Sequence, residues 1–155
     1  MAAVARKKDL RDVDRKRSAL MSRIRSTGTQ PELVVRRALH ARGFRFRLHR
    51  RDLPGKPDIV LPRHRLVIFV HGCFWHQHAS CKLASSPKTR GDYWSPKLAS
   101  NVARDERHAR ELAAAGWRVE IVWECDTRDV RRLYERIEAI CSGLDRLHGG
   151  APLQR

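Results

Sequence analysis

Two residues that flank a pair of β-rich runs carry side chains suited to phosphodiester hydrolysis. Asp58 stands at the start of the run 57–61, and His71 directly follows the run 66–70. A carboxylate can hold Mg²⁺, and an imidazole can act as the base that prepares a water molecule. Adjacent strands would bring the two side chains together. The alternative for Asp58 is a turn residue that opens a strand without any catalytic role.

Three cysteines and one histidine supply the ligand types of a closed tetrahedral zinc site. These residues are Cys73, His78, Cys81 and Cys125. The stretch 72–95 has few aliphatic side chains, so a bound metal would hold this irregular segment in place. The competing interpretation is that the cysteines are small buried hydrophobic residues. We expect Cys141, on an apolar helix face, to be structural.

Two acidic residues each have a structural and a functional interpretation. Asp105 is seven residues from both Leu98 and Leu112, so it lies on the apolar stripe of its own helix. An inward acid is costly unless it is paired. A salt bridge to an arginine and a bond to an imidazole such as that of His76 are equally open. Glu32 is explained by helix capping, because it stands three residues after Thr29.

Aromatic side chains gather in and after the Cys/His-rich stretch. Phe74-Trp75 lies inside it and Tyr93-Trp94 follows it. They can form a small satellite core around a zinc site, or they can wedge between base pairs of DNA. The residues alone leave these two interpretations balanced. We expect three other histidines that stand among arginines to face solvent: His40, His49 and His64.

The periodicity of apolar residues predicts the elements that position these groups. It indicates helix, three strands, helix, strand and helix, without internal repeats. A helix begins at Thr29 and stops at Gly43, and a second is launched by Ser95-Pro96 and ends at Gly116. The predicted strands are 44–48, 57–61, 66–70 and 117–124, and the closing helix carries Val130, Leu133, Ile137 and Ile140. This order predicts a single α/β domain with a mixed sheet.

Length and charge narrow the class of protein. The chain has 155 residues, enough for one compact domain, and a net charge of +16. Residues 1–51 hold 16 basic and 4 acidic side chains, which favours a polyanionic partner such as nucleic acid. The longest apolar run, 66–70, is too short to cross a bilayer. We expect an intracellular protein without a membrane partner, and a reducing compartment favours metal-binding cysteines over disulfides.

The expected domain organisation follows from this charge distribution. Residues 1–17 form a basic arm, 18–143 the folded domain and 144–155 a C-terminal tail. The arm is either a solvated tail or a segment that orders on a phosphate backbone, and the total charge favours the second.

The run His71-Gly-Cys-Phe-Trp-His76 closely resembles the very-short-patch mismatch repair endonucleases, the Vsr family. Pro57-Asp58, Asn101-Val-Ala-Arg-Asp105, Gly116-Trp-Arg-Val119 and Val122-Trp-Glu-Cys125 strengthen the likeness. The resemblance covers about residues 14–126. It implies a restriction-endonuclease-like α/β core, in which helices flank a central mixed sheet, with a structural Zn²⁺. It also implies Mg²⁺-dependent nicking of one strand 5′ to the thymine of a T·G mismatch.

The resemblance also implies roles for particular residues. Asp58 and the backbone carbonyl of Val70 would hold Mg²⁺. His76, oriented by Asp105, would be the general base, and His71 would stabilise charge at the scissile phosphate. Supporting the metal waters and the phosphate would fall to Glu32 and Asn101.

For recognition, the resemblance implies that aromatic side chains enter the major groove beside the mismatch. These would be Phe74, Trp75 and Trp94. Met21 would enter from the minor groove, and Lys97 would approach the wobble pair. The zinc ligands would be Cys73, His78, Cys81 and Cys125.

The expected partner is double-stranded DNA with a T·G mismatch, bound by a monomer in the bacterial cytoplasm, at the nucleoid while it acts. Repair accessory proteins are further candidate partners. Two alternatives remain open. One is a zinc-stabilised DNA-binding module without catalysis, and the other is a nuclease of the same fold with another target.

Overall fold

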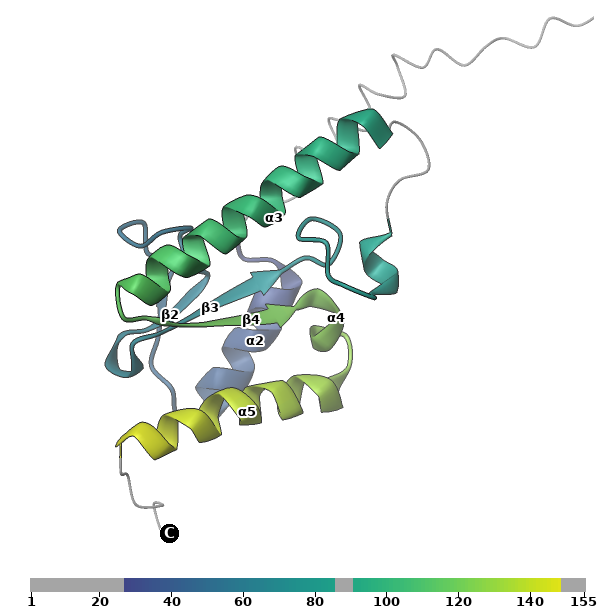
Figure 1. Cartoon of the computed structure of the whole chain (residues 1–155). Coiled ribbons are helices and arrows are strands. Elements are labelled where there is room, and N and C mark those ends of the chain that lie inside the picture. Colours follow the sequence, from purple (N-terminus) through teal and green to yellow (C-terminus); the bar gives the residue numbers. More distant parts are fainter. Residues whose placement is uncertain (1–26, 86–90, 149–155) are drawn as a thin grey trace, which may run out of the picture.

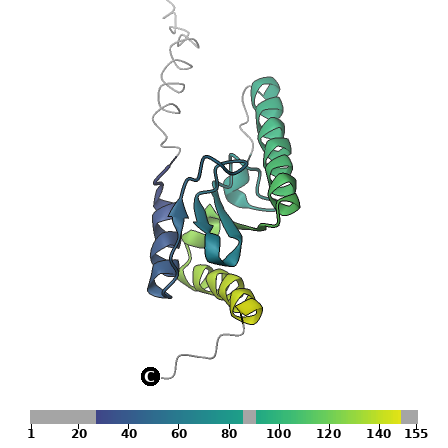
Figure 2. The ribbon, with the colours of Figure 1, turned by 90° about the vertical axis from the view of Figure 1, so that its left-hand side faces the viewer.

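The computed structural model describes residues 27–85 and 91–148, without the side chains of 145–148. The predicted basic arm and Met21 lie outside this part of the chain. The described residues form three layers, in which a sheet separates the long helix α3 from the helices α2 and α5 (Figures 1 and 2).

The sheet has four strands in the order β1-β2-β3-β4. The strands are β1 (Arg47–Leu48), β2 (Ile59–Leu61), β3 (Leu66–His71) and β4 (Arg118–Trp123). Strand β2 pairs antiparallel with β1 and with β3, and β4 pairs in parallel with β3. The mixed sheet and the order of elements are therefore as predicted. Strand β2 begins at the end of the sheet where β3 and β4 finish, so Asp58 and His71 lie at the same end of the sheet.

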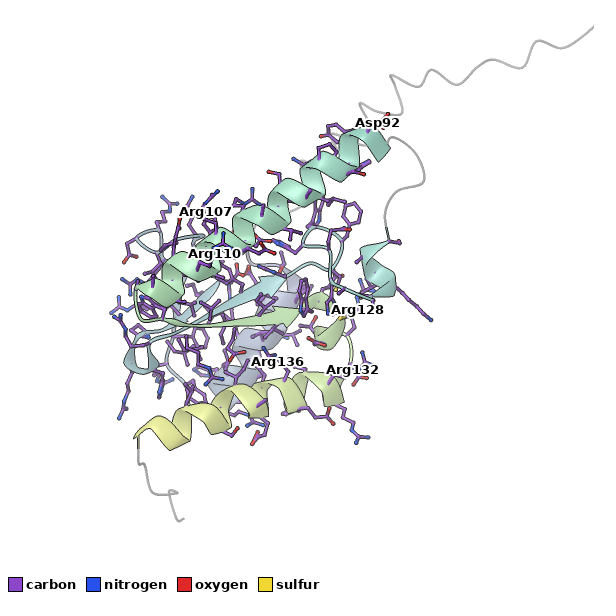
Figure 3. All side chains as sticks on the ribbon, in the orientation of Figure 1. Asp92, Arg107, Arg110, Arg128, Arg132 and Arg136 are labelled. Atoms are coloured by element: carbon purple, nitrogen blue, oxygen red, sulfur yellow. The ribbon has the colours of Figure 1, made fainter. Side chains whose placement is uncertain are left out.

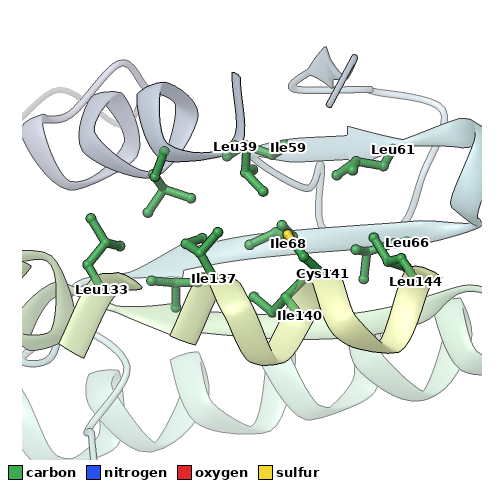
Figure 4. Packing of buried hydrophobic residues seen from close by; sticks show 13 residues of the cluster. Leu39, Ile59, Leu61, Leu66, Ile68, Leu133, Ile137, Ile140, Cys141 and Leu144 are labelled. Carbon is green, nitrogen blue, oxygen red and sulfur yellow. The ribbon is translucent and has the colours of Figure 1, made fainter. Parts of the chain in front are cut away.

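Two helices cover one face of the sheet and enclose the main core. They are α2 (Gln30–Ala41) and α5 (Val130–His148). Leu39 of α2 and Ile137 of α5 are fully buried against strand residues such as Ile68 (Figure 4). Fully burying such a side chain contributes about 1.5–3 kcal/mol. This core fixes where α2 begins, and hence where Glu32 lies.

Helix α3 (Gly91–Ala114) covers the opposite face. Leu112 packs there with Val60, Val67 and Trp117 in a second, smaller cluster. The predicted start at Ser95-Pro96 is wrong, because α3 begins at Gly91 and contains Pro96. Proline at this sixth position of the helix cannot donate a hydrogen bond to the Asp92 carbonyl, so α3 lacks one backbone hydrogen bond near its start.

Two other boundaries differ from the prediction. The strand expected over 44–48 is short, since only Arg47–Leu48 pairs with β2, and Phe44 and Phe46 pack against the main core instead. The expected boundary between domain and tail at residue 143 falls inside α5, where Leu144 is fully buried.

The remaining described elements are short. They are the 3₁₀ turns Pro62–His64 and Lys82–Ala84 and the helix α4 (Glu124–Thr127). None of the described helices is long and apolar enough to cross a membrane.

Candidate active site

A cleft of about 660 Å³ opens at the edge of the sheet where β2 begins and β3 ends. Residues from both helix layers line it as well, because α2 starts there and the middle of α3 passes over it. Six of its lining residues are those that the sequence singled out for catalysis: Glu32, Asp58, His71, His76, Asn101 and Asp105. The fold therefore gathers into one cleft residues that span more than seventy positions of the chain.

Asp58 is fixed by the neighbouring strand. Its Oδ2 accepts a hydrogen bond of 2.7 Å from the backbone N–H of Val70. Burial raises the pKa of Asp58 to about 7, and the negative charge of Glu32 adds to the rise, whereas the Val70 hydrogen bond opposes it. Two carboxylates held this close favour a cation between or beside them. Glu32, Asp58 and Val70 all line the cleft, and carboxylate and carbonyl oxygens are the ligands that Mg²⁺ prefers.

His76 Nδ1 and Asp105 Oδ2 form a direct hydrogen bond. This contact decides the question that the periodicity of α3 left open, because the inward acid meets an imidazole. An imidazole bound to a carboxylate through Nδ1 is held in one orientation and presents its other nitrogen, Nε2, to a reacting group. Asp105 is thus placed to orient His76.

His71 stacks on His76, with ring centroids 3.8 Å apart and planes inclined by 9°. Burial lowers the pKa of His71 to about 4, the neighbouring imidazole of His76 adds to the fall, and the Asp105 carboxylate opposes it. His71 is therefore a neutral imidazole at neutral pH. It can donate an N–H to a phosphate oxygen without carrying a charge of its own.

Glu32 is almost completely buried at the start of α2. The side chain of Thr29 caps the helix by accepting from Glu32 N–H at 3.4 Å, as the sequence predicts. The Glu32 carboxylate reaches back to Gly28, whose N–H donates to Oε2 at 2.6 Å. Oε2 also accepts from Arg36 at 2.7 Å. The Glu32 carboxylate therefore accepts a backbone hydrogen bond at the start of α2 and also lines the cleft.

The expectation that His49 faces solvent is wrong. Its side chain is 27% exposed, and its Nδ1 lies 3.8 Å from Asp58 Oδ1. Arg36, a second residue that the sequence reasoning missed, lies behind the cleft residue Glu32, and its Nη2 is 2.9 Å from His49 Nε2. The spacing of four residues between Glu32 and Arg36 was a readable signal of their pairing. No local signal marks His49, which arrives through the pairing of β1 with β2.

Asn101 ties α3 to the loop that carries His76. Its Nδ2 donates to the backbone carbonyl of Trp75 at 3.1 Å, and its Oδ1 accepts from Arg104 at 3.0 Å. Lys97, one turn earlier on α3, also lines the cleft. The middle of α3 therefore contributes to the cleft through Lys97, Asn101 and Asp105.

The aromatic residues form a contiguous cluster beside the cleft. The ring centroids of Phe74 lie 5.1 Å from those of Trp75 and 5.5 Å from those of Trp94, and Trp75 lies 6.0 Å from Trp94. Phe74 and Trp75 are partly exposed, and the neighbouring Tyr93 is 53% exposed. A cluster that is partly open to solvent can stack against the bases of a nucleic acid.

Cys73, His78, Cys81 and Cys125 come together in a second group, with ligand atoms all within 4.8 Å of one another. His78 Nδ1 lies 3.7 Å from Cys73 Sγ and 3.3 Å from Cys125 Sγ. Burial raises the pKa of the Cys73 thiol to about 12. Three sulfur ligands and one nitrogen can hold a metal ion, and His78 is further fixed by stacking on Trp123 at 4.1 Å.

The sequence is similar to those of one family of DNA endonucleases. A family model described as "DNA mismatch endonuclease Vsr" matches residues 9–83. The type II nicking enzyme V.XorIIP of Xanthomonas oryzae pv. oryzae is 55% identical over 125 residues, which is 81% of this chain and 91% of that protein. The DNA mismatch endonuclease Vsr of Escherichia coli (strain K12) is 42% identical over 129 residues, which is 83% of this chain and 81% of that protein.

The fold is also similar to that of a solved structure. The catalytic domain of the homing endonuclease I-Bth0305I matches with a TM-score of 0.50 and 19% sequence identity. The match covers 75% of this chain and 97% of that domain. The match shows that the described elements share the α/β fold of that domain.

Proposed function

Since the chain belongs to the Vsr family of DNA mismatch endonucleases, we propose that it nicks one strand of duplex DNA 5′ to the thymine of a T·G mismatch. Such mismatches arise when 5-methylcytosine deaminates, and the nick starts the replacement of a short patch. We expect the protein to act as a monomer in the bacterial cytoplasm, because a single asymmetric mismatch gives no reason for a symmetric dimer.

The observation that carries this proposal is the direct contact of His76 with Asp105 within the cleft that also holds Asp58. His76 is the general base, which takes the proton of the attacking water on Nε2. Asp105 keeps the ring in place and stabilises the imidazolium that forms. His71, neutral because burial lowers its pKa to about 4, donates an N–H to the scissile phosphate.

Two metal ions complete the proposed machinery. Asp58 and the backbone carbonyl of Val70 hold Mg²⁺, with Glu32 and Asn101 supporting its waters and the phosphate. When bound, Mg²⁺ neutralises charge that builds on the phosphate oxygens. Zn²⁺ is held by Cys73, His78, Cys81 and Cys125, and its role is structural, because three cysteines and one histidine close a tetrahedral site.

Mismatch recognition is assigned to the aromatic cluster beside the cleft. Phe74, Trp75 and Trp94 wedge in beside the mismatch from the major groove, Met21 enters from the minor groove, and Lys97 approaches the wobble pair. A T·G pair stacks less well than a matched pair. Unstacking costs a few kcal/mol per step and least at a mismatch, so wedging itself discriminates.

The test uses a short duplex with one T·G pair, labelled at the end of each strand in turn, with and without Mg²⁺. The same duplex with T·A is the control. We expect a single nick just 5′ of the mismatched thymine that requires both Mg²⁺ and the mismatch. Binding without any nick would indicate a DNA-binding module, and equal cutting of both duplexes would discard mismatch repair.

A further inference from the structure

Arg36 is a half-buried arginine for which the proposed reaction has no role. Its side chain is 16% exposed, and it lies one turn after Glu32 on α2. Its Nη2 is 2.7 Å from Glu32 Oε2 and 2.9 Å from His49 Nε2. Its Nε is buried and has no hydrogen-bond partner among the residues that the structure describes. The guanidinium therefore lies between the Glu32 carboxylate and the His49 ring, inside the protein.

The two side chains that hold Arg36 belong to a group of metal-ligating type. Ligand atoms of Glu32, His49 and Asp58 all lie within 4.8 Å of one another. A guanidinium has only N–H donors, so His49 Nε2 must accept, and its lone pair is used by Arg36. A metal ion would need that same lone pair. Arg36 and a metal ion bound by Glu32 and His49 are therefore mutually exclusive.

We propose that Arg36 takes the place of a divalent cation. Its guanidinium fills the position that a metal ion held by Glu32, His49 and Asp58 would occupy, so the cleft binds one divalent ion fewer than these side chains can hold. The inference rests on the proposed function, because it concerns the metal ions of the same cleft. In this arrangement Asp58 binds the catalytic metal ion, and the charge of Glu32 is balanced by the Arg36 guanidinium.

Charge and backbone geometry support this assignment. The Glu32 side chain is only 3% exposed, and a buried carboxylate needs a positive partner. Arginine supplies that charge at every physiological pH. His49 cannot move away easily, because its backbone N–H donates to the carbonyl of Asp58 at 3.3 Å. Glu32 and His49 are thus held on either side of the guanidinium, and Asp58 lies beside His49.

The experiment counts Mn²⁺ ions bound per chain, by electron paramagnetic resonance on the full-length protein with its structural metal retained. Arg36→Met keeps the length of the side chain and removes its charge. We expect it to bind one more Mn²⁺ per chain than the wild type. Arg36→Lys, which keeps a cation, should bind the same number as the wild type. Arg36→Ala is a second neutral variant with the same expectation as Arg36→Met, and circular dichroism checks that each variant is folded.

A second variant tests where the additional ion binds. Arg36→Met combined with His49→Ala should lose the additional Mn²⁺ and return to the wild-type number. The proposal is overturned if folded Arg36→Met or Arg36→Ala binds no additional ion, if Arg36→Lys also gains one, or if the additional ion persists without His49. These outcomes concern the difference between variants. Failure of the wild type to nick T·G DNA would instead contradict the proposed function.

Discussion

Burial shifts the pKa values of two side chains of the cleft in opposite directions. It raises the pKa of Asp58 to about 7 and lowers the pKa of His71 to about 4. Both shifts favour the uncharged form of the group. For His71 this yields a neutral hydrogen-bond donor at neutral pH. For Asp58 it means that ionisation is unfavourable until a cation compensates the charge.

The shift of Asp58 predicts how stability depends on pH. The folded protein binds the Asp58 proton more tightly than the unfolded chain does. The contribution of protonated Asp58 to the free energy of unfolding is therefore fully present below pH 3.8 and is lost as pH rises through about 7. Without Mg²⁺, wild type should therefore lose about 4 kcal/mol of stability over this window relative to Asp58→Asn. Urea unfolding of the two proteins at a series of pH values measures this difference. Added Mg²⁺ should restore the loss in wild type above pH about 7 and have no such effect on Asp58→Asn. Parallel curves for the two proteins would contradict the shift.

The contact between His76 and Asp105 predicts a specific kinetic effect. Asp105→Asn removes the charge that orients the ring and stabilises the imidazolium. We expect kcat for nicking to fall by about 10²–10⁴ with little change in KM for DNA, because the interaction matters most in the transition state. The matched control is Glu106→Gln, the next residue, whose side chain is 64% exposed and pairs with Arg110. Single-turnover assays of both variants give the comparison, and equal rates would remove Asp105 from the reaction.

At the scale of elements, α3 connects the aromatic cluster to the cleft. It carries Trp94 and Lys97 near its start, and then Asn101, which holds the Trp75 carbonyl. Asp105 follows one turn later and holds His76. Residues four apart lie on one face of a helix, so a single element aligns these contacts. The orientation of α3 therefore fixes the loop 72–78 relative to the sheet.

The loop before β2 packs on the same helix and offers a test of that orientation. A Cβ on Gly55 would lie 2.7 Å from His108 Nδ1, whereas nothing lies within 4 Å of a Cβ on Gly43, and both residues have positive φ. Gly55→Ala and Gly43→Ala therefore share the backbone strain, and only the first adds a clash. We expect Gly55→Ala to lower the free energy of unfolding by at least about 1 kcal/mol more than Gly43→Ala. Denaturant unfolding measures both, and equal losses would show that His108 yields without cost.

The loop 72–81 gives a second prediction at this scale. It contains His76 and also three of the four residues of the candidate zinc group, Cys73, His78 and Cys81. Cys125→Ser should lower the affinity for Zn²⁺ by more than about 100-fold. A residue that only hydrogen-bonds to a metal ligand costs about 10- to 100-fold when it is replaced. Nicking should fall with it as the loop loses its anchor. Cys141→Ser changes a buried cysteine of the main core outside this group and should keep its zinc. Metal analysis of the purified variants measures their zinc content. Zinc retained in Cys125→Ser would exclude Cys125 as a ligand.

For the molecule as a whole, charge is distributed unequally along the chain: residues 1–51 hold 16 basic and 4 acidic side chains, and residues 52–155 hold 17 and 13. Figure 3 labels arginines on both outer helix layers, and many of them are engaged with acids. Arg107 pairs with Glu111, Arg128 with Glu124 and Arg136 with Glu120. We therefore expect the excess positive charge of residues 1–51 to supply most of the sequence-independent affinity for DNA.

The salt dependence of DNA binding tests this expectation. Residues 1–17 contain seven lysines and arginines. Their deletion should reduce the slope of log K against log salt concentration by up to about 6, at about 0.9 per phosphate contact. The preference for T·G over T·A should remain, because backbone contacts carry no sequence information. Fluorescence anisotropy over a range of salt concentrations measures the slope. An unchanged slope would mean that the arm does not contact DNA.

Much of the site could be predicted from the sequence, because local patterns carry the necessary information. The alternation and periodicity of apolar residues predicted the order of helices and strands and the mixed sheet. Spacing along α3 predicted that Asp105 faces inward, and the residue types predicted the group of Cys73, His78, Cys81 and Cys125. The run His71–His76 was specific enough to indicate the family.

Other features were decided by tertiary structure alone. The periodicity of α3 could not say whether Asp105 meets an arginine or His76, because the partner comes from a loop nearly thirty residues away. His49 looked like a surface residue among arginines, and only the pairing of β1 with β2 brings it to Asp58. The raised pKa of Asp58 likewise depends on burial and on Glu32. Local propensity is a property of neighbouring residues, whereas burial and long-range contacts arise only when distant segments pack together.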